Sequence, residues 1–174
     1  FITTTGVGVV PDGVDVSGDR ARPGDTVLLS GSIGDHGVAV MSKRENLSFE
    51  TSIESDSAAL HDLVAAMVRE VPGVRCLRDP TRGGLATTLN ELARQSGVGM
   101  RIRETSVPVK PAVAAACELL GLDPLYVANE GKVDFIEPQF SGIPSVRRPP
   151  SSVRWWRTST DLCRWRPLSA VAGW

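Results

Sequence analysis

The stretch DPTRGG, which begins at Asp79, places an acid, a hydroxyl, an arginine and two glycines directly before an apolar helical pattern. A helix N-terminus offers free amide donors and the positive end of the helix dipole, so it favours an anion such as phosphate. Arg82 can hold a phosphate with two hydrogen bonds, Thr81 can donate its hydroxyl, and Asp79 can bind a Mg²⁺ ion that neutralises the phosphate. Gly83 and Gly84 let the backbone approach such a ligand. The alternative is that Asp79 or Thr81 only caps the helix and Arg82 is solvated.

A second glycine-rich turn, GSIGDHG, precedes another helical pattern and contains a histidine. Histidine changes its charge near neutral pH, so His36 is a candidate for acid–base chemistry. The alternative is a tight turn in which Asp35 caps the helix and His36 is exposed. The residues alone favour the turn and leave the catalytic interpretation open.

The stretch ANEG contains an amide and a carboxylate at a glycine turn that we expect to follow a short strand. A partly buried Glu130 can act as a general base, and Asn129 can orient a carbonyl or amide of a ligand. The same letters are also a common turn composition, so the signal in isolation is weak.

Hydrophobic periodicity predicts the elements that must position these loops. Strands and helices alternate, and the helices have about three turns each. This order predicts an α+β fold, a layered α/β arrangement with helices packed on a mixed sheet. The expected elements are a strand at 25–31, a helix with Asp35 as its N-cap, a helix from Ser57 to about Val71, a strand at 74–79, a helix from Gly84 to about Gly97, a strand in which Val98, Met100 and Ile102 alternate with polar residues, a helix from Pro111 to Gly121 that buries Cys117, and a strand and turn at 124–133.

The character of the sequence changes at about residue 134. From there the chain shows neither helical nor strand periodicity, contains all four tryptophans, and is rich in Pro, Ser and Arg. Such a mixture cannot bury enough apolar surface in one place to offset its ordering entropy. We therefore expect one domain at 1–133 and an unmatched tail at 134–174, either disordered or encoded out of frame.

The overall composition is that of an ordinary globular protein. The 174 residues carry a formal net charge of -1, with 41% hydrophobic and 22% charged residues, which gives no indication of nucleic-acid binding. We expect a cytoplasmic protein, because no apolar run approaches the roughly 20 residues of a membrane helix and no signal peptide is visible. The three cysteines form no CxxC pair, so neither a zinc site nor a disulfide framework is indicated.

Three motifs together carry a resemblance to a known family. SGSIGDHG, RDPTRGGLATTLNELA and LYVANEGK, in this order and spacing, resemble the C-terminal domain of the HypE family of hydrogenase maturation factors, the carbamoyl dehydratases. That family belongs to a superfamily with aminoimidazole ribonucleotide synthetase, selenophosphate synthetase and thiamin monophosphate kinase. The resemblance covers about residues 1–133.

The resemblance implies a two-domain, homodimeric, ATP-dependent enzyme that makes the cyanide ligand of [NiFe]-hydrogenase. Its carbamoyl group is carried as a thiocarbamate on a C-terminal cysteine, and ATP activates the carbamoyl oxygen. The implied cofactors are ATP and Mg²⁺, and the implied partners are HypC, HypD and HypF, with no nucleic acid and no membrane. Glu130 would be the base and Asn129 would orient the amide. Asp79, Thr81, Arg82, Gly83 and Gly84 would bind phosphate or Mg²⁺, and Asp35 and His36 would line the same cleft.

The sequence also departs from the family pattern. The family's N-terminal domain is not present before Phe1, and the family typically ends in Pro-Arg-Ile-Cys, whereas this chain ends in AVAGW. Cys163 lies in the unmatched tail and inherits no role. We therefore expect a fragment that does not modify itself: carbamoyl phosphate, the upstream carbamoyltransferase and ATP should not cyanate this chain.

Three other functions stay open at this point. The chain can be a non-catalytic binding module for maturation partners. It can also share the phosphoryl-transfer activity of a sister family. A nucleic-acid arm built from the Arg- and Trp-rich tail is the least supported, because the whole chain is not basic.

Overall fold

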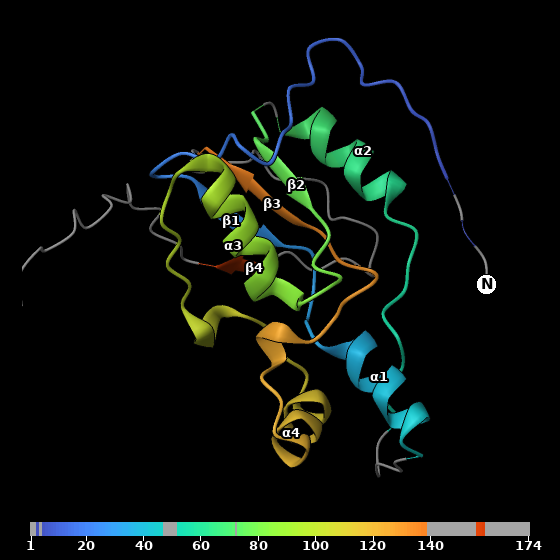
Figure 1. Cartoon of the computed structure of the whole chain (residues 1–174). Helices are drawn as coiled ribbons and strands as arrows, with labels where there is room; N and C mark the ends of the chain where they lie inside the picture. Colours follow the sequence, from blue (N-terminus) through green and yellow to red (C-terminus); the bar gives the residue numbers. More distant parts are fainter. Residues whose placement is uncertain (1–2, 4, 47–51, 72, 139–155, 159–174) are drawn as a thin grey trace, which may run out of the picture.

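The computed structural model describes residues 3, 5–46, 52–71, 73–138 and 156–158 (Figure 1). Its centre is an antiparallel sheet with the strand order β2, β3, β1, β4. In the register of the central pair, Leu28 lies opposite Phe135. The strands are β1 (Thr26–Leu29), β2 (Cys76–Arg78), β3 (Asp134–Glu137) and β4 (Trp156–Thr158).

Two helices cover the two faces of this sheet. Side chains alternate between the faces of a strand, so Val27 and Leu29 point to one face and Leu28 to the other. α3 (Gly84–Ser96) covers the first face and α2 (His61–Glu70) the second. The cluster under α3 contains Val27, Leu29, Cys76, Leu85, Leu89, Leu92 and Ile136, and the cluster under α2 contains Leu28, Met67, Val74, Val133 and Phe135.

A second, smaller layer lies beyond the end of the sheet, where α1 (Asp35–Arg44) and α4 (Pro111–Leu120) pack together (Figure 1). Their shared cluster consists of Val38, Val113, Ala116, Cys117 and Val127. α4 begins with a proline at its first position and ends at Gly121, whose φ of 66° allows a C-cap that other residues adopt at a cost. The short 3-10 helix η2 (Pro124–Tyr126) follows, and η1 (Glu104–Ser106) precedes α4.

The α+β class and the packing of helices on a sheet are confirmed, but several details differ from expectation. The described strand pairings are antiparallel rather than mixed, apart from an isolated parallel bridge between Ile33 and Val109. Residues 100–103 form no strand; Met100 and Ile102 nevertheless pack against the core. The residues before ANEG form η2 instead of a strand.

The core also continues beyond residue 133. Residues 134–137 form β3, which lies between β1 and β2 in the sheet, and all four of its residues are buried. β4, at 156–158, pairs with β1. The division into a domain at 1–133 and a tail at 134–174 therefore stays a prediction for most of the tail, including Cys163, which lies outside the described residues.

Two further observations concern membrane spans and cysteines. No helix among the described residues is long and apolar enough to cross a bilayer. Cys76 and Cys117 are free and buried, and burial raises the pKa of both thiols. A raised thiol pKa disfavours the nucleophilic thiolate, as expected for Cys117 as a core residue.

Candidate functional site

Asn129 joins the three sequence motifs at one point. Its side chain is fully buried, its Oδ1 accepts a hydrogen bond from the amide of Gly34 at 2.7 Å, and its Nδ2 donates to the carbonyls of Pro80 and Val127 at 3.1 and 3.0 Å. The amide of Asn129 donates to the Pro80 carbonyl as well, at 3.2 Å. Both side-chain donor hydrogens are therefore used within the protein. These contacts support a positioning role, while orientation of a ligand amide by Asn129 stays a prediction.

Gly84 allows the start of α3 to touch the segment before Asn129. Its φ is 63°, and a Cβ atom there would lie 2.6 Å from the Leu125 carbonyl oxygen and 2.7 Å from that of Val127. These neighbours are backbone atoms and cannot move aside as a flexible side chain can. The second glycine of DPTRGG is thus required for contact between two loops of the protein.

We expect Gly84→Ala to destabilise the fold by about 3 kcal/mol, because left-handed strain of about 1–2 kcal/mol is added to an overpacking cost of about 1–3 kcal/mol. Gly121→Ala is the matched control, since its φ is 66° and open space surrounds the added Cβ. It should cost only the strain. Denaturant unfolding of both variants measures the difference, and equal losses would contradict the close approach at Gly84.

The amide end of α3 has no side-chain cap. Its N-cap is Gly83, with a φ of 73° and no side-chain hydrogen bond to the helix amides. Thr81 instead donates its hydroxyl to Asp79 at 2.9 Å, and Arg82 is exposed. The alternative is therefore wrong about a cap by Asp79 or Thr81, whereas the exposure of Arg82 agrees with it. The lack of a side-chain cap and the exposed Arg82 are compatible with a phosphate group at this helix end.

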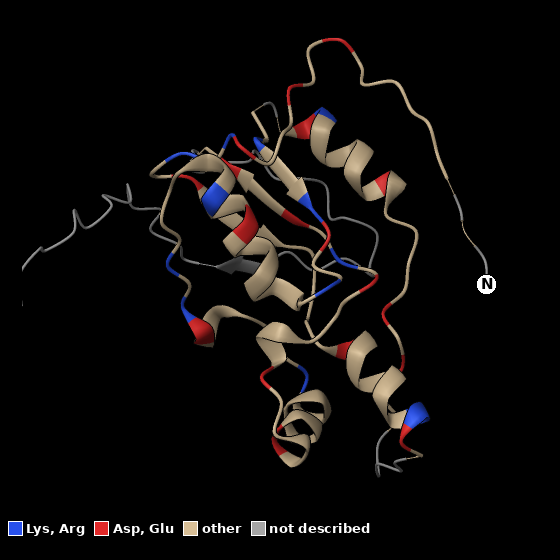
Figure 2. Ribbon diagram, viewed as in Figure 1, with Lys and Arg blue, Asp and Glu red and all other residues tan. Residues whose placement is uncertain are grey.

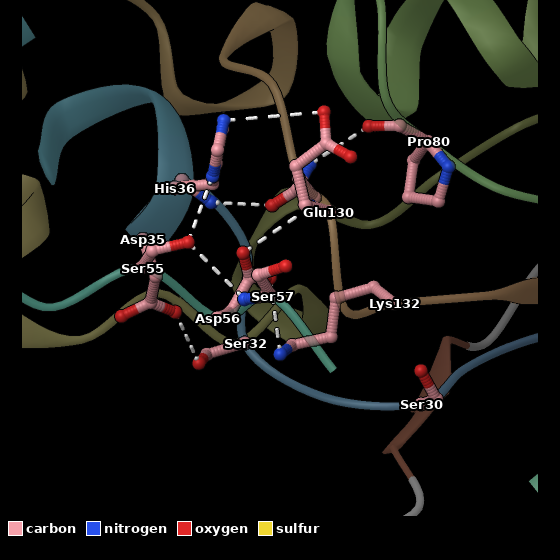
Figure 3. A network of polar contacts seen from close by, with 12 residues as sticks. Ser30, Ser32, Asp35, His36, Ser55, Asp56, Ser57, Pro80, Glu130 and Lys132 are labelled. Carbon is pink, nitrogen blue, oxygen red and sulfur yellow. Dashed lines mark hydrogen bonds and ion pairs between the residues drawn. The ribbon is translucent and has the colours of Figure 1, made fainter. Parts of the chain in front are cut away.

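His36 and Glu130 are brought together from two motifs, although the chain separates them widely (Figure 3). His36 Nε2 lies 3.9 Å from Glu130 Oε1, and the two side chains are 24% and 43% exposed. That separation exceeds a hydrogen bond and lies within ion-pair distance. The partial exposure of Glu130 is compatible with a base that meets a ligand.

Asp35 has a different place from the one expected. It is the first residue of α1, whose N-cap is Gly34, so it does not cap the helix. Its buried carboxylate lies 2.7 Å from Lys110 Nζ and accepts a hydrogen bond from Ser32 at 2.9 Å. Asp35 thus ties α1 to the start of α4, and lining of the cleft by this residue stays a prediction.

The motifs gave no indication of three further residues at this site. Ser55 lies 2.8 Å from His36 Nδ1, Asp56 accepts from the amide of Glu130 at 3.2 Å, and Lys132 pairs with Asp56 at 3.1 Å. Ser55 and Asp56 belong to a serine-rich segment without periodicity, so no local pattern marks them. Lys132 stands in the motif LYVANEGK, but nothing in that motif predicts a role for it.

Asp134 is a buried carboxylate next to the DPTRGG loop. Figure 2 shows that β3 carries acidic positions within the sheet. Neither carboxylate oxygen of Asp134 has a hydrogen-bond partner among the described residues. Burial raises the pKa of Asp134 well above its ordinary value, and the nearby charge of Asp79 raises it further.

The Mg²⁺ prediction rests on a single exposed carboxylate. No group of three or more His, Cys, Asp or Glu side chains among the described residues is arranged to hold a metal ion. Mg²⁺ commonly binds one or two carboxylates together with substrate phosphates, so Asp79 fits an ion that arrives with a nucleotide.

Comparisons with protein families, curated proteins and solved structures find similarity to related proteins. The model of the family "AIR synthase related protein, C-terminal domain" matches residues 22–136. The carbamoyl dehydratase HypE of Azotobacter vinelandii is 71% identical over 138 residues, which are 79% of this chain and 40% of that protein. A crystal structure of the hydrogenase maturation protein HypE in complex with ATP has a TM-score of 0.70 and 56% identity, covering 71% of this chain and 37% of that one.

A HypE–HypF complex is similar as well, with a TM-score of 0.72 and 50% identity over 74% of this chain and 42% of the other. The chain spans about 40% of the length of the curated relatives it matches.

Proposed function

Since this chain belongs to the AIR synthase related proteins through their C-terminal domain, we propose that it forms the C-terminal part of an ATP-dependent carbamoyl dehydratase of hydrogenase maturation. One observation carries the proposal. Asn129, directly before Glu130, bonds to Gly34 in the turn that carries His36 and to Pro80 in the loop that leads into α3, whose start has no side-chain cap. The loop proposed to bind phosphate and the turn that carries the proposed base, Glu130, are thereby joined.

The chemistry needs both groups. ATP transfers a phosphoryl group to the carbamoyl oxygen of an enzyme-bound thiocarbamate, which turns a poor leaving group into phosphate. The carbon–oxygen bond then breaks while protons leave the nitrogen, and a thiocyanate results. In this chain Glu130 takes a proton from the nitrogen, while Arg82 and the amides at Gly83 and Gly84 hold phosphate. Mg²⁺, bound at Asp79, would neutralise phosphate charge.

The proposed partners follow from the same assignment. One similar solved structure is a complex of HypE with HypF, and we propose that the complete protein meets a HypF-like carbamoyltransferase. HypC and HypD are the other proposed partner proteins, and a homodimer is the proposed oligomeric state. A cytoplasmic location is proposed with them.

Binding of Mg-ATP tests the phosphate half of this site. Arg82→Ala should weaken ATP binding by about tenfold or more, because a charge-assisted contact with phosphate is lost. Arg94→Ala, which removes an exposed arginine from the other end of α3, should leave the affinity unchanged. Titration of the labelled chain with Mg-ATP, followed by amide chemical shifts, measures both. Equal affinities for the two variants would place the phosphate elsewhere, and capture of HypF that is insensitive to Arg82→Ala would then favour a binding module.

A further inference from the structure

The segment at 52–60, just before α2, lies against the turn that carries Glu130 (Figure 3). The backbones touch: a Cβ atom on Gly131 would lie 1.6 Å from the carbonyl oxygen of Asp56. This segment belongs to none of the three motifs, yet its side chains contact both members of the His36–Glu130 pair. We call residues 52–60 the strap.

Ser55 is placed to influence the tautomer of His36. The amide of Ser57 donates to Ser55 Oγ at 3.2 Å, and Ser55 Oγ lies 2.8 Å from His36 Nδ1. A serine hydroxyl has one hydrogen to donate and two acceptor positions, and the Ser57 amide occupies one of those positions, so the hydrogen is available for donation to Nδ1. A neutral His36 that accepts at Nδ1 carries its own hydrogen on Nε2, the nitrogen that faces Glu130.

Asp56 holds the other member of the pair. One carboxylate oxygen accepts from the amide of Glu130, and the second lies 3.1 Å from Lys132 Nζ. The side chains of Asp56 and Lys132 are 4% and 14% exposed, so this ion pair is shielded from water. The Lys132 stem also lies against Gly31, where a Cβ would be 2.7 Å from its Cε atom. The glutamate turn is thus fixed on both sides of Gly131.

We propose that Ser55 and Asp56 are positioning residues of the dehydration site, with Ser55 directing the Nε2 hydrogen of His36 toward Glu130 and Asp56 fixing the backbone that carries Glu130. This inference rests on the proposed function, because it assigns the strap a purpose only if Glu130 is the base. A base must keep its carboxylate in line with the proton it takes, and misplacement by about 1 Å is costly to rate. Ordering the pair before the substrate arrives removes that cost from the reaction.

The first test is the tautomer of His36 in this chain, measured from the ¹⁵N shifts of its ring nitrogens at mildly alkaline pH. His61 is the other histidine, and its side chain is 78% exposed, so it serves as an internal reference. We expect His36 to carry its hydrogen on Nε2, and Ser55→Ala to shift it toward the tautomer mixture of His61. Ser57→Ala keeps the backbone donor and should change nothing. A hydrogen on Nδ1, or no response to Ser55→Ala, would overturn the proposal.

The second test is hydrogen exchange at the Glu130 amide. Asp56→Ala should accelerate it about tenfold or more through loss of its acceptor, while Asp56→Asn retains an acceptor oxygen and should stay closer to the parent. Glu54→Ala, at an exposed strap position, is the control, and unchanged exchange in β1 and β3 shows that the fold is intact. Exchange within about twofold of the parent in a folded Asp56→Ala variant would reject the role of Asp56.

The Ser55 test needs no change at Asp56, so it decides the tautomer claim if Asp56→Ala fails to fold. Both readouts are taken without substrate. A failure of the proposed function would appear instead as full dehydratase activity in a Glu130→Gln enzyme, with the tautomer and the exchange pattern unchanged.

Discussion

Replacement of Glu130 by glutamine is expected to slow dehydration by about 10²- to 10⁴-fold, the usual contribution of a general base. The assay needs a complete enzyme, so residues 22–136 of this chain replace the matching part of the Azotobacter vinelandii carbamoyl dehydratase, to which the chain is 71% identical. Glutamine keeps the shape of the side chain and cannot accept the proton. Binding of ATP should change little, because the proposed phosphate-binding groups are on another loop.

Glu118→Gln in the same hybrid enzyme is the control. Glu118 is exposed on α4, so the same change of charge there should leave the rate unchanged. Single-turnover conversion of the carbamoylated enzyme, followed by mass spectrometry, separates the chemical step from carbamoyl transfer. If both variants react at the parent rate, Glu130 is not the base.

Asp134→Ala is expected to stabilise this chain by about 2 kcal/mol at pH 7, because it removes a buried carboxylate whose oxygens lack hydrogen-bond partners among the described residues. The pH dependence gives a sharper signature. The pKa of Asp134 is higher in the folded state, so the unfolded chain releases this proton first. The contribution of Asp134 to stability should therefore be most favourable below the ordinary aspartate pKa of about 3.9 and become less favourable as the pH rises toward its folded-state pKa.

The stabilising effect of Asp134→Ala should consequently be larger at pH 7 than at pH 4. Asp12→Ala, at an exposed turn, is the control and should change stability by less than about 0.5 kcal/mol at either pH. Urea unfolding at the two pH values measures both variants. An advantage that is the same at both pH values would mean that Asp134 titrates normally in the folded chain.

The sequence predicted those helix ends and strands whose boundaries are set by residues within the element or next to it. Gly97 and Gly121 mark the ends of α3 and α4, and both have left-handed backbone conformations at these C-caps. The buried run Thr26–Leu29 forms β1, close to the expected strand. In each case the residue that determines the boundary lies within the element or next to it.

Long-range pairing explains the expectations that failed. Val98, Met100 and Ile102 do alternate and do contact the core, but a strand needs a partner along its whole length, and periodicity does not supply one. Asp35 had the right type for an N-cap, yet it pairs with Lys110, which is remote in sequence. That contact exists only in the folded chain, so a local capping preference of about 1 kcal/mol does not predict it.

The same distinction between local signals and long-range contacts applies to the candidate site. The motifs marked His36, Glu130 and the DPTRGG loop because glycines and titratable side chains stand together there. Ser55 and Asp56 have no such marker, since a serine-rich segment suggests only a loop. Their contacts with His36 and Glu130 depend on how the segment before α2 folds back.

The most direct measurement is single-turnover conversion of the carbamoylated hybrid enzyme with ATP. We expect the mass to fall by one water in an ATP-dependent reaction, as thiocarbamate becomes thiocyanate, and this loss to disappear in the Glu130→Gln variant. A hybrid that is folded, carbamoylated and able to bind ATP but shows no loss of water would contradict the assignment of this chain to carbamoyl dehydration.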